Sequence, residues 1–482
     1  MNIADKFHQF ERSFDLTEFT VDGFWYYPIA KMAIYFELAG QPGTGNTEEK
    51  PGGSGKRQLI SQLVSAFKWK YKSKLPRSTE YLFVDNALTR RQIGTGRYEN
   101  MYIGPVMNTI DKDKQLLLEY PAPDFGHYSD IDKNNIYFPD WDIIKIFIKA
   151  RFRKKKRITD TASLRALYKL FDLAFDAHFL NDRLNKTFLF IEFFKKFLKK
   201  IHPRVVLLID GYNYKQMALI FAAKELGIPI IELQHGLINT SHMAYMYSQV
   251  IDKRLFADYL FTFGEYFSGI IERNSAAWGK ERVLSMGFPY IETIKERPAE
   301  LPERLIELAG QHTIIYVTSQ WTVRDNLKSF IIQLSEKLDR EYFIFYKIHP
   351  GEKNAFSFYK EFAGKHNLEL ILDKTVNSLE IMKVADVHST VYSTSYFESV
   401  FFELPNIFIE ALRYSKNIED FVDDETSFLA KDINQYLTYL NSIKTDASLA
   451  QNLHKKKYFY YRSDALNTMS NIIDKIVNPT GT

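Results

Sequence analysis

The sequence predicts an α/β protein with two doubly wound domains, each a parallel sheet flanked by helices. Its 482 residues exceed one ordinary hydrophobic core and suit two domains. From about residue 80, short apolar runs alternate with longer helical patterns, which is typical of α/β units. The apolar runs are continuous rather than alternating, which indicates parallel strands buried on both faces.

The composition excludes several classes of protein. Hydrophobic residues make up 45%, aromatic residues 15% and charged residues 25%, which is a globular composition. The absence of cysteine excludes disulfides, a thiolate nucleophile and cysteine-based metal sites. No apolar run approaches the roughly 18–20 residues that span a bilayer, and residues 1–20 lack the apolar core of a signal peptide. We therefore expect a cytoplasmic protein or one on the inner face of a membrane.

The predicted N-terminal domain covers residues 1–290. It contains a flexible Gly- and Pro-rich loop at 40–57. The strands 205–209 and 228–233 enclose a helix at 216–226, and this order predicts a right-handed βαβ unit.

The predicted C-terminal domain covers residues 300–450 and follows a charged, Pro-containing joint near 288–300. Residues 451–482 are expected to form a closing helix. Two Rossmann-like halves with such a joint describe the GT-B architecture, in which the carboxyl ends of both sets of strands face a shared cleft. The predicted strands of this domain are 313–317, 342–348, 368–372, 387–392 and 406–409.

Two strand ends of the N-terminal domain carry candidate catalytic residues. Asp210 precedes a permissive Gly211 and could accept a proton from a hydroxyl nucleophile, although it could instead cap the next helix. His235, between Gln234 and Gly236, could act as a base or contact a phosphate, and the alternative is a satisfied core histidine. We expect Gln234 and Gly236 to position the substrate.

Two strand ends of the C-terminal domain predict a phosphate site. Lys347 and His349 alternate along a strand, so both point to one face and suit a diphosphate or phosphodiester; the alternative is a surface lysine beside a turn histidine. The run Ser393-Thr394-Ser395 is expected at a helix N-terminus, where amides and the dipole attract phosphate. Glu398 follows and is counted with these residues as donor-binding, while a capping box is the alternative reading of the same geometry.

Positive charge is concentrated in a predicted basic helical insertion at 145–204. Between Lys145 and Arg204 there are 17 basic and 5 acidic residues, a net charge of +12, so the rest of the chain carries −8. A helix at 188–201 separates charged residues from phenylalanines, as in an ordinary surface helix or an interfacial one. We favour a membrane or anionic-acceptor contact over nucleic acid, because no nucleic-acid module accompanies the patch. The predicted contact residues are Arg151, Arg153, Lys154, Lys155, Lys156 and Arg157.

No metal site is expected. Asp-x-Asp triplets at 111–113, 130–132 and 140–142 fall in loop-like stretches and are interpreted as solvated acids. Neither a His-Glu-x-x-His motif nor an EF-hand spacing occurs.

Over residues 200–410 the sequence resembles bacterial capsule and surface-polysaccharide glycosyltransferases of the GT-B fold. The similar enzymes include sialyltransferases, polysialyltransferases, β-Kdo transferases and teichoic-acid glycerophosphotransferases. The resemblance implies that Asp210 is the catalytic carboxylate and that His349 and the hydroxyls at 393–395 contact the donor phosphate. Ile209 departs from the sialyltransferase pattern, which has a second acid there, and the E-x7-E motif of many retaining enzymes is absent, which favours inversion. The motifs that carry the resemblance are Asp210-Gly211, the stretch 232–236, His349-Pro350 and the turn 389–395.

We therefore expect a metal-independent, GT-B-type glycosyltransferase without a cofactor. It would move a sugar from a nucleotide-activated donor, cytidine-linked first and uridine-linked second, to a glycan or lipid-linked glycan. Asp210 is the first choice for the base and His235 the second. The alternatives are a nucleotide-sugar 2-epimerase and a non-catalytic, membrane-bound subunit of polysaccharide assembly.

Overall fold

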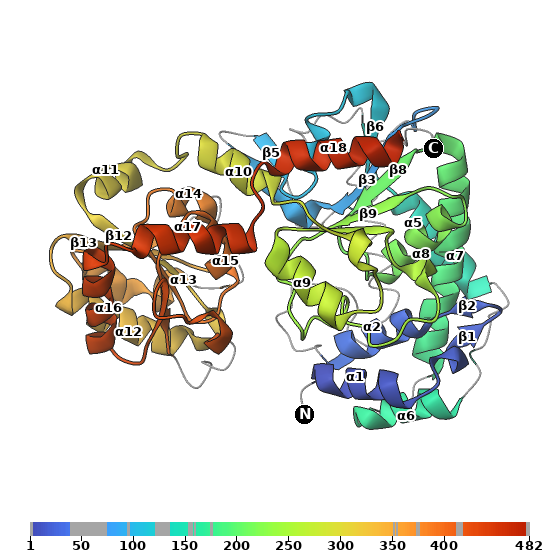
Figure 1. The fold of residues 1–482 in the computed structure, drawn as a ribbon, viewed down its shortest axis with the longest axis horizontal. Coiled ribbons are helices and arrows are strands. Elements are labelled where there is room, and N and C mark those ends of the chain that lie inside the picture. Colours follow the sequence, from blue (N-terminus) through green and yellow to red (C-terminus); the bar gives the residue numbers. More distant parts are fainter. Residues whose placement is uncertain are drawn as a thin grey trace. The chain divides into compact units, whose positions relative to one another are not determined.

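The chain folds into two compact units, each built on one parallel sheet (Figure 1). Unit 1 comprises Met1–Met286 and Leu466–Thr482, and unit 2 comprises Gly287–Ala465. This organisation confirms the predicted α/β class with two Rossmann-like sheets. The predicted loop at 40–57 and the cations at 153–157 lie outside the described residues. The computed structural model describes residues 3–38, 75–93, 97–120, 135–152, 158, 161–173, 177–349, 352, 355–372, 376–410 and 418–478.

The sheet of unit 1 has seven strands in the order β11-β10-β9-β8-β3-β6-β7, and neighbouring strands are parallel. The first strand along the chain, β3, lies beside the fourth, β8. The winding reverses between these two strands, so their carboxyl ends mark the topological switch point at which such sheets bind ligands. The strands are β3 (Tyr81–Asn86), β6 (Gln115–Tyr120), β7 (Ile136–Tyr137), β8 (Val205–Leu208), β9 (Ile230–Leu233), β10 (Tyr259–Thr262) and β11 (Val283–Ser285).

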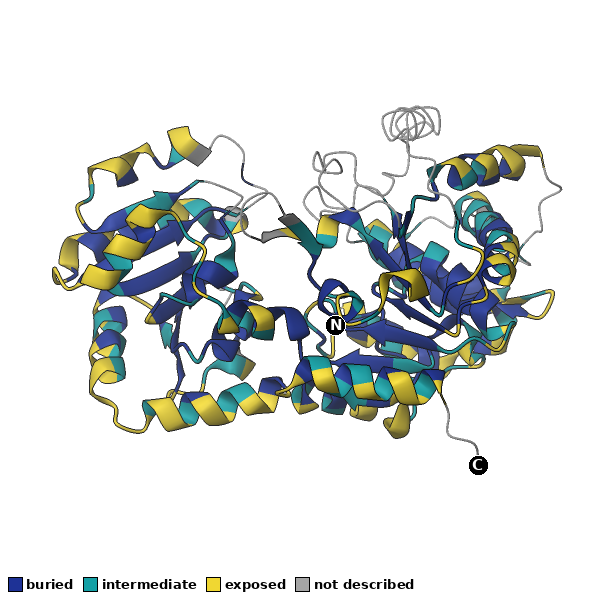
Figure 2. Cartoon of the chain, turned by 90° about the horizontal axis from the view of Figure 1, so that it is seen from above, coloured by how far each residue is buried: buried dark blue, intermediate teal, exposed yellow. Residues whose placement is uncertain are grey.

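Helices surround this sheet, and their inner faces are buried while their outer faces are exposed (Figure 2). The predicted basic insertion is the connection from β7 to β8. Its longest helix, α7, packs against α5 and α8. The predicted amphipathic character of α7 is confirmed, since Phe190 and Phe194 are buried while Lys196 and Lys199 are exposed. Two short strand pairs lie outside the main sheet, β1 (Thr20–Val21) with β2 (Phe24–Trp25) and β4 (Arg90–Ile93) with β5 (Arg97–Asn100). The helices of unit 1 are α1 (Ile3–Ser13), α2 (Tyr27–Leu38), α4 (Gly104–Met107), α5 (Asp140–Phe152), α6 (Ala162–Leu170), α7 (Ala177–Ile201), α8 (Tyr214–Lys224), α9 (Glu265–Asn274) and α18 (Ala465–Val477).

The sheet of unit 2 has six parallel strands in the order β14-β13-β12-β15-β16-β17, with its switch point between β12 and β15. Its core combines apolar side chains of the strands with those of α12 and α16. The strands are β12 (Thr313–Thr318), β13 (Tyr342–Lys347), β14 (Leu368–Ile371), β15 (Val387–Thr390), β16 (Asn406–Ile409) and β17 (Ser427–Ala430). The helices are α10 (Pro289–Glu296), α11 (Glu303–Gln311), α12 (Arg324–Lys337), α13 (Ala355–Phe358), α14 (Ser378–Met382), α15 (Ser395–Phe401), α16 (Ile433–Thr445) and α17 (Leu449–Tyr460).

The prediction of one closing helix at 451–482 is wrong. Two helices occupy this stretch, α17 and α18. Asp464, between them, has a left-handed backbone with φ of 55°, which a continuous right-handed helix excludes. The two helices also belong to different units, because Met469 and Ile473 of α18 are buried in the core of unit 1.

Candidate active site

The switch point of unit 1 carries Asp210. This residue follows the buried end of β8 and adopts a left-handed backbone with φ of 60°, a conformation that Asp tolerates better than most residues. It does not cap α8, because the capping side chain is Asn213, whose Oδ1 accepts from the Lys215 amide at 3.0 Å. The helix-capping alternative for Asp210 is therefore wrong.

Glu232 of β9 fixes the turn that holds Asp210. Its Oε1 accepts hydrogen bonds from the Gly211 amide at 3.0 Å and from the Tyr245 hydroxyl at 2.8 Å. A Cβ atom on Gly211 would lie 2.3 Å from Glu232 Oε2, so this close approach requires glycine. Burial raises the pKa of Glu232 to about 7.

Asp210 and His235 are brought together through Tyr212. The Tyr212 hydroxyl lies 3.2 Å from His235 Nε2. Burial and the interaction with Asp210 raise the pKa of Tyr212 well above its ordinary value. Burial, together with the neighbouring His242, lowers the pKa of His235 to about 4. At neutral pH His235 is therefore uncharged and available for hydrogen bonds.

A loop at 239–248 adds two aromatic residues that sequence reasoning did not assign to the site. The His242 ring is 5.7 Å from Tyr212 and 4.8 Å from Tyr245. Burial lowers the pKa of His242 to about 4. The loop has no helical or strand periodicity, and its only sequence signal is a His- and Tyr-rich run shortly after Gly236.

A buried ion pair from the N-terminal helices holds this loop in place. Lys31 Nζ of α2 lies 2.7 Å from Glu11 Oε1 of α1, and neither side chain is exposed. Lys31 also donates to the Met246 carbonyl at 2.5 Å, and the Ser248 amide donates to Glu11 Oε2 at 2.6 Å. Both charged groups thus bind the backbone of the loop that carries His242 and Tyr245.

The side chain of Gln234 stabilises the turn after β9 through hydrogen bonds to the main chain. Its Nε2 donates to the Gly236 carbonyl at 2.8 Å, and its Oε1 accepts from the Phe263 amide at 2.8 Å. With both ends of the amide bound to the main chain, Gln234 positions His235 by shaping the backbone. Gly236 is exposed at the same turn.

In unit 2, Lys347 and His349 lie at the end of β13. Lys347 is buried and His349 half-buried. A buried Glu352, which sequence reasoning did not single out, closes the turn: its Oε1 accepts from the His349 amide at 3.1 Å, and its Oε2 accepts from the Tyr359 hydroxyl at 2.9 Å. Ser319, which follows β12, also donates through its hydroxyl to Glu352.

The end of β15 carries the predicted hydroxyl run. The Ser395 hydroxyl lies 3.2 Å from Nε2 of the buried His388, and the Thr318 hydroxyl lies 3.0 Å from the same atom. His388 Nδ1 donates to Asn406 Oδ1 at 2.7 Å. Burial lowers the pKa of His388 to about 4. Ser395 is therefore part of an internal network around a neutral histidine.

Ser393 and Thr394 differ from Ser395, because they are half-buried and exposed, respectively. Thr394 precedes α15 with helical dihedral angles and makes no side-chain capping bond, so it does not form the capping box that was the alternative reading. The Ser393 hydroxyl instead accepts from the Ser395 amide at 3.2 Å. Glu398 is half-buried in α15.

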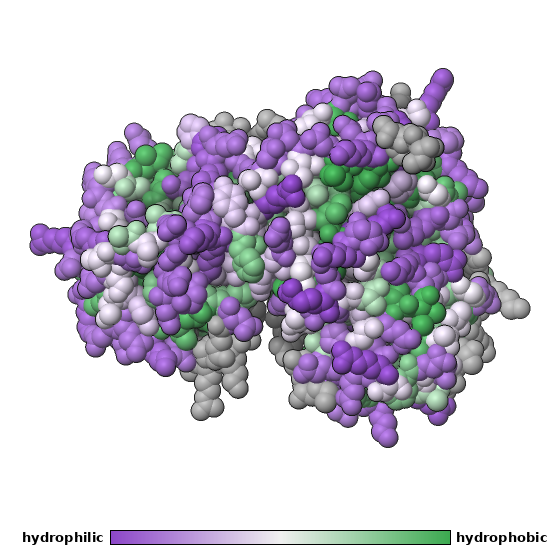
Figure 3. Space-filling view, viewed as in Figure 1, coloured by the Kyte–Doolittle hydropathy of each residue, from purple (hydrophilic) through white to green (hydrophobic). Residues whose placement is uncertain are grey.

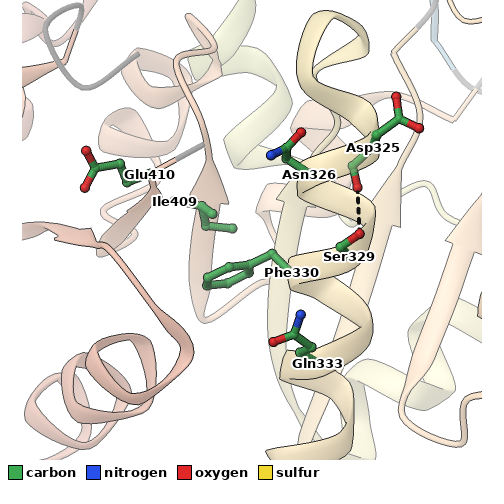
Figure 4. A pocket seen from close by; sticks show the side chains of 7 residues that line it. All are labelled: Asp325, Asn326, Ser329, Phe330, Gln333, Ile409 and Glu410. Atoms are coloured by element: carbon green, nitrogen blue, oxygen red, sulfur yellow. Dashed lines mark hydrogen bonds between the residues drawn. The ribbon is translucent and has the colours of Figure 1, made fainter. Parts of the chain in front are cut away.

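A cavity of about 350 Å³ lies between α12 and the end of β16 (Figure 4). Asn326 and Phe330 extend from α12 towards Ile409, whereas the carboxylate of Asp325 points away. The Ser329 hydroxyl donates to the Asp325 carbonyl at 3.0 Å. The cavity lies one strand away from the hydroxyl run, because β16 is the neighbour of β15.

The remaining sequence predictions concern charge and metal. Arg151 is exposed in α5, while Arg153, Lys154, Lys155, Lys156 and Arg157 lie outside the described residues. Within the described part of the chain, no three His, Asp or Glu side chains are grouped to hold a metal ion. None of the described helices is both long and apolar enough to cross a membrane.

The two doubly wound sheets define a GT-B fold, and comparison with solved structures agrees. A UDP-N-acetylglucosamine 2-epimerase matches with a TM-score of 0.51 and 12% identity, over 84% of this chain and 96% of its own. A Listeria monocytogenes protein provisionally assigned the same activity matches with a TM-score of 0.54 and 10% identity, over 84% and 98%. The wall teichoic acid polymerase TagF matches with a TM-score of 0.49 and 12% identity, over 95% and 99%. At these identities the likeness concerns the fold alone.

No protein-family model matches the sequence, and no curated protein matches it either.

Proposed function

We propose that this chain is a glycosyltransferase that moves a sugar from a nucleotide-activated donor to a hydroxyl of a surface glycan or lipid-linked glycan. One observation carries the proposal: each of the two sheets has a chemically distinct set of side chains at the carboxyl ends of strands at or next to its switch point. Unit 1 presents the carboxylate of Asp210 with two neutral hydrogen-bonding groups, Tyr212 and His235. Unit 2 presents basic and hydroxyl groups at the ends of β13 and β15.

In the proposed reaction unit 1 binds the acceptor and supplies the base. Asp210 removes the proton of the acceptor hydroxyl, whose oxygen forms a bond to the anomeric carbon while the bond from that carbon to the donor phosphate breaks. The inversion of configuration follows from this single displacement. His235 and Tyr212 orient the carboxylate and the acceptor, and positioning supplies much of the rate enhancement.

Unit 2 is proposed to bind the donor. Lys347 and His349 contact the phosphate and stabilise the negative charge of the leaving nucleotide, helped by Ser393 and Thr394. We place the nucleoside in the cavity beside α12, where the Phe330 ring offers a stacking surface. Cytidine-linked donors are proposed first and uridine-linked donors second, without a required metal ion.

A thermal-shift screen with CMP, CDP, UDP, GDP and their sugars tests the proposal. A nucleotide at a hundredfold excess over its dissociation constant adds about 2.7 kcal/mol to the free energy of unfolding. We expect the best nucleotide to stabilise the protein, and the matching sugar donor to be consumed only when an acceptor glycan is added. Turnover should survive a chelator.

Two outcomes would contradict the proposal. Stabilisation by no nucleotide would favour a non-catalytic subunit of polysaccharide assembly. Epimerisation of a donor in the absence of any acceptor would favour a nucleotide-sugar 2-epimerase.

A further inference from the structure

The outer face of α5 (Asp140–Phe152) exposes large apolar side chains. In the view of Figure 3 most of the surface is hydrophilic, with smaller apolar patches between the polar residues. Trp141 and Ile148 are each 46% exposed and Phe152 is 84% exposed. They are seven and four residues apart, which places them within an arc of about 40° on an α-helix.

The opposite face of α5 already has a partner. Ile143, Ile146 and Ala150 are buried, and the helix packs against α7. The exposed ridge of Trp141, Ile148 and Phe152 is therefore not a core face that happens to be turned outward. It is a second apolar surface on a helix that is already docked.

Cations flank this ridge. Lys145 and Lys149 lie on one side of it by helical position and Arg151 on the other, and all three are exposed. Asp142 lies 3.4 Å from Lys145. In the sequence the helix is followed directly by five more cations at 153–157. Apolar residues that include Trp and Phe, flanked by Lys and Arg, are the pattern of a helix that lies in the interface of an anionic bilayer.

The exposed apolar residues of α17 lack this combination. Tyr458 and Phe459 of α17 are adjacent in sequence, so they are about 100° apart around the helix. Their cationic neighbours are engaged within the fold, since Lys456 lies 2.6 Å from Asp423 and Lys457 lies 3.7 Å from Glu403. The surface of α5 thus differs from that of α17 in both apolar alignment and charge.

We infer that the outer face of α5 is a docking surface for an anionic lipid bilayer. Trp141, Ile148 and Phe152 enter the interface between headgroups and acyl chains, while Lys145, Lys149 and Arg151 contact lipid phosphates. The inference concerns this surface and does not depend on the chemistry proposed for the switch points.

Sedimentation with vesicles of an equal mixture of phosphatidylcholine and phosphatidylglycerol tests the inference on the full chain. We expect binding that weakens with salt and is much lower for pure phosphatidylcholine. Phe152→Ser should lower the partition coefficient about tenfold, Ile148→Ser roughly threefold to tenfold, and Lys149→Gln about fivefold. The matched control is Ile306→Ser, because Ile306 of α11 is also 46% exposed, and it should bind like the wild type.

Tryptophan fluorescence gives a second readout. Vesicles should shift the emission to shorter wavelength in the wild type, and Trp141→Phe should abolish this shift. Circular dichroism of the variants confirms folding. Equal binding of Ile148→Ser and Ile306→Ser would overturn the inference, as would the absence of any vesicle binding. A dimer of the wild type that Ile148→Ser dissociates would also overturn it, because the face would then bind a second copy of the chain.

Discussion

The two switch points share a strand order but differ in what surrounds their histidines. In unit 1, His235 is half-buried, lies beside Tyr212 and belongs to a turn that the buried Gln234 shapes. In unit 2, His388 is fully buried, with Nδ1 bound to Asn406 and Nε2 within reach of two hydroxyls. The same topology thus places a half-buried histidine at the carboxyl ends of one sheet, and a fully buried histidine that bonds to neighbouring hydroxyls in the other.

Among the variants that test the difference between the two sites, Asp210→Asn in unit 1 should have the largest effect, a loss of turnover. The substitution keeps the shape and removes the charge that accepts a proton. Turnover should fall by about 10²–10⁴, with nucleotide affinity nearly unchanged, as steady-state kinetics and thermal shifts would measure.

His235→Ala is the companion variant. Near-normal turnover of Asp210→Asn together with inactive His235→Ala would reverse the two roles. Activity in both variants would exclude the carboxyl ends of β8 and β9 as the catalytic site.

Glu232→Gln tests the buried carboxylate of unit 1 through the pH dependence of the free energy of unfolding. Burial raises the pKa of Glu232 to about 7, so the folded state binds its proton more tightly than the unfolded state. The wild type therefore loses stability as pH rises from about 4.5 to about 7, by up to about 3 kcal/mol, and Gln cannot titrate. Denaturant unfolding of both proteins at pH 5 and pH 8 measures the difference. A difference in unfolding free energy that is independent of pH would contradict the assignment.

His349→Ala tests the donor side of unit 2. Loss of a charge-assisted hydrogen bond to phosphate should weaken nucleotide binding by about 1–3 kcal/mol, measured by calorimetry. His366→Ala is the matched control, because this exposed histidine precedes β14 at the amino ends of the strands. Unchanged affinity in a folded His349→Ala protein would refute the donor contact.

Ser395→Ala and Thr394→Val form a pair with the smallest expected effects. Ser395 bonds inside the protein, so its loss should cost about 1 kcal/mol of unfolding free energy and spare nucleotide affinity. Thr394 is exposed, so its change should leave stability within about 0.5 kcal/mol and lower nucleotide affinity a few-fold. The reverse pattern would place the phosphate on the internal network.

Much of the fold could be predicted because buried parallel strands consist of consecutive apolar residues, which are visible in the sequence. Residues 406–409 and 342–348 were expected as strands and match β16 and β13 closely. The packing of α18 against unit 1 could not be predicted. An amphipathic pattern indicates that a helix packs against a core, but it does not indicate which of the two cores. The helix break at Asp464 rests on a single backbone conformation, which the sequence pattern does not encode.

The candidate site was predictable where polar residues follow strands directly, as with Asp210 and His349. It was not predictable where a residue contributes from an irregular loop, as with His242 and Tyr245. The buried role of His388 was hidden because it sits among hydroxyl residues that suggested an open, ligand-binding turn. His388 lies in β15 between β12 and β16, and its side chain is fully buried there.

The return of α18 to unit 1 has a consequence for the order of folding during synthesis. Unit 2 is one uninterrupted segment, so it can complete its fold as soon as it has left the ribosome. Unit 1 must wait, because Met469, Ile473 and Val477 join its core only after all of unit 2 has been translated. The nascent sheet of unit 1 therefore exposes the apolar face that α18 later covers throughout this interval, and such exposed surface is prone to aggregate.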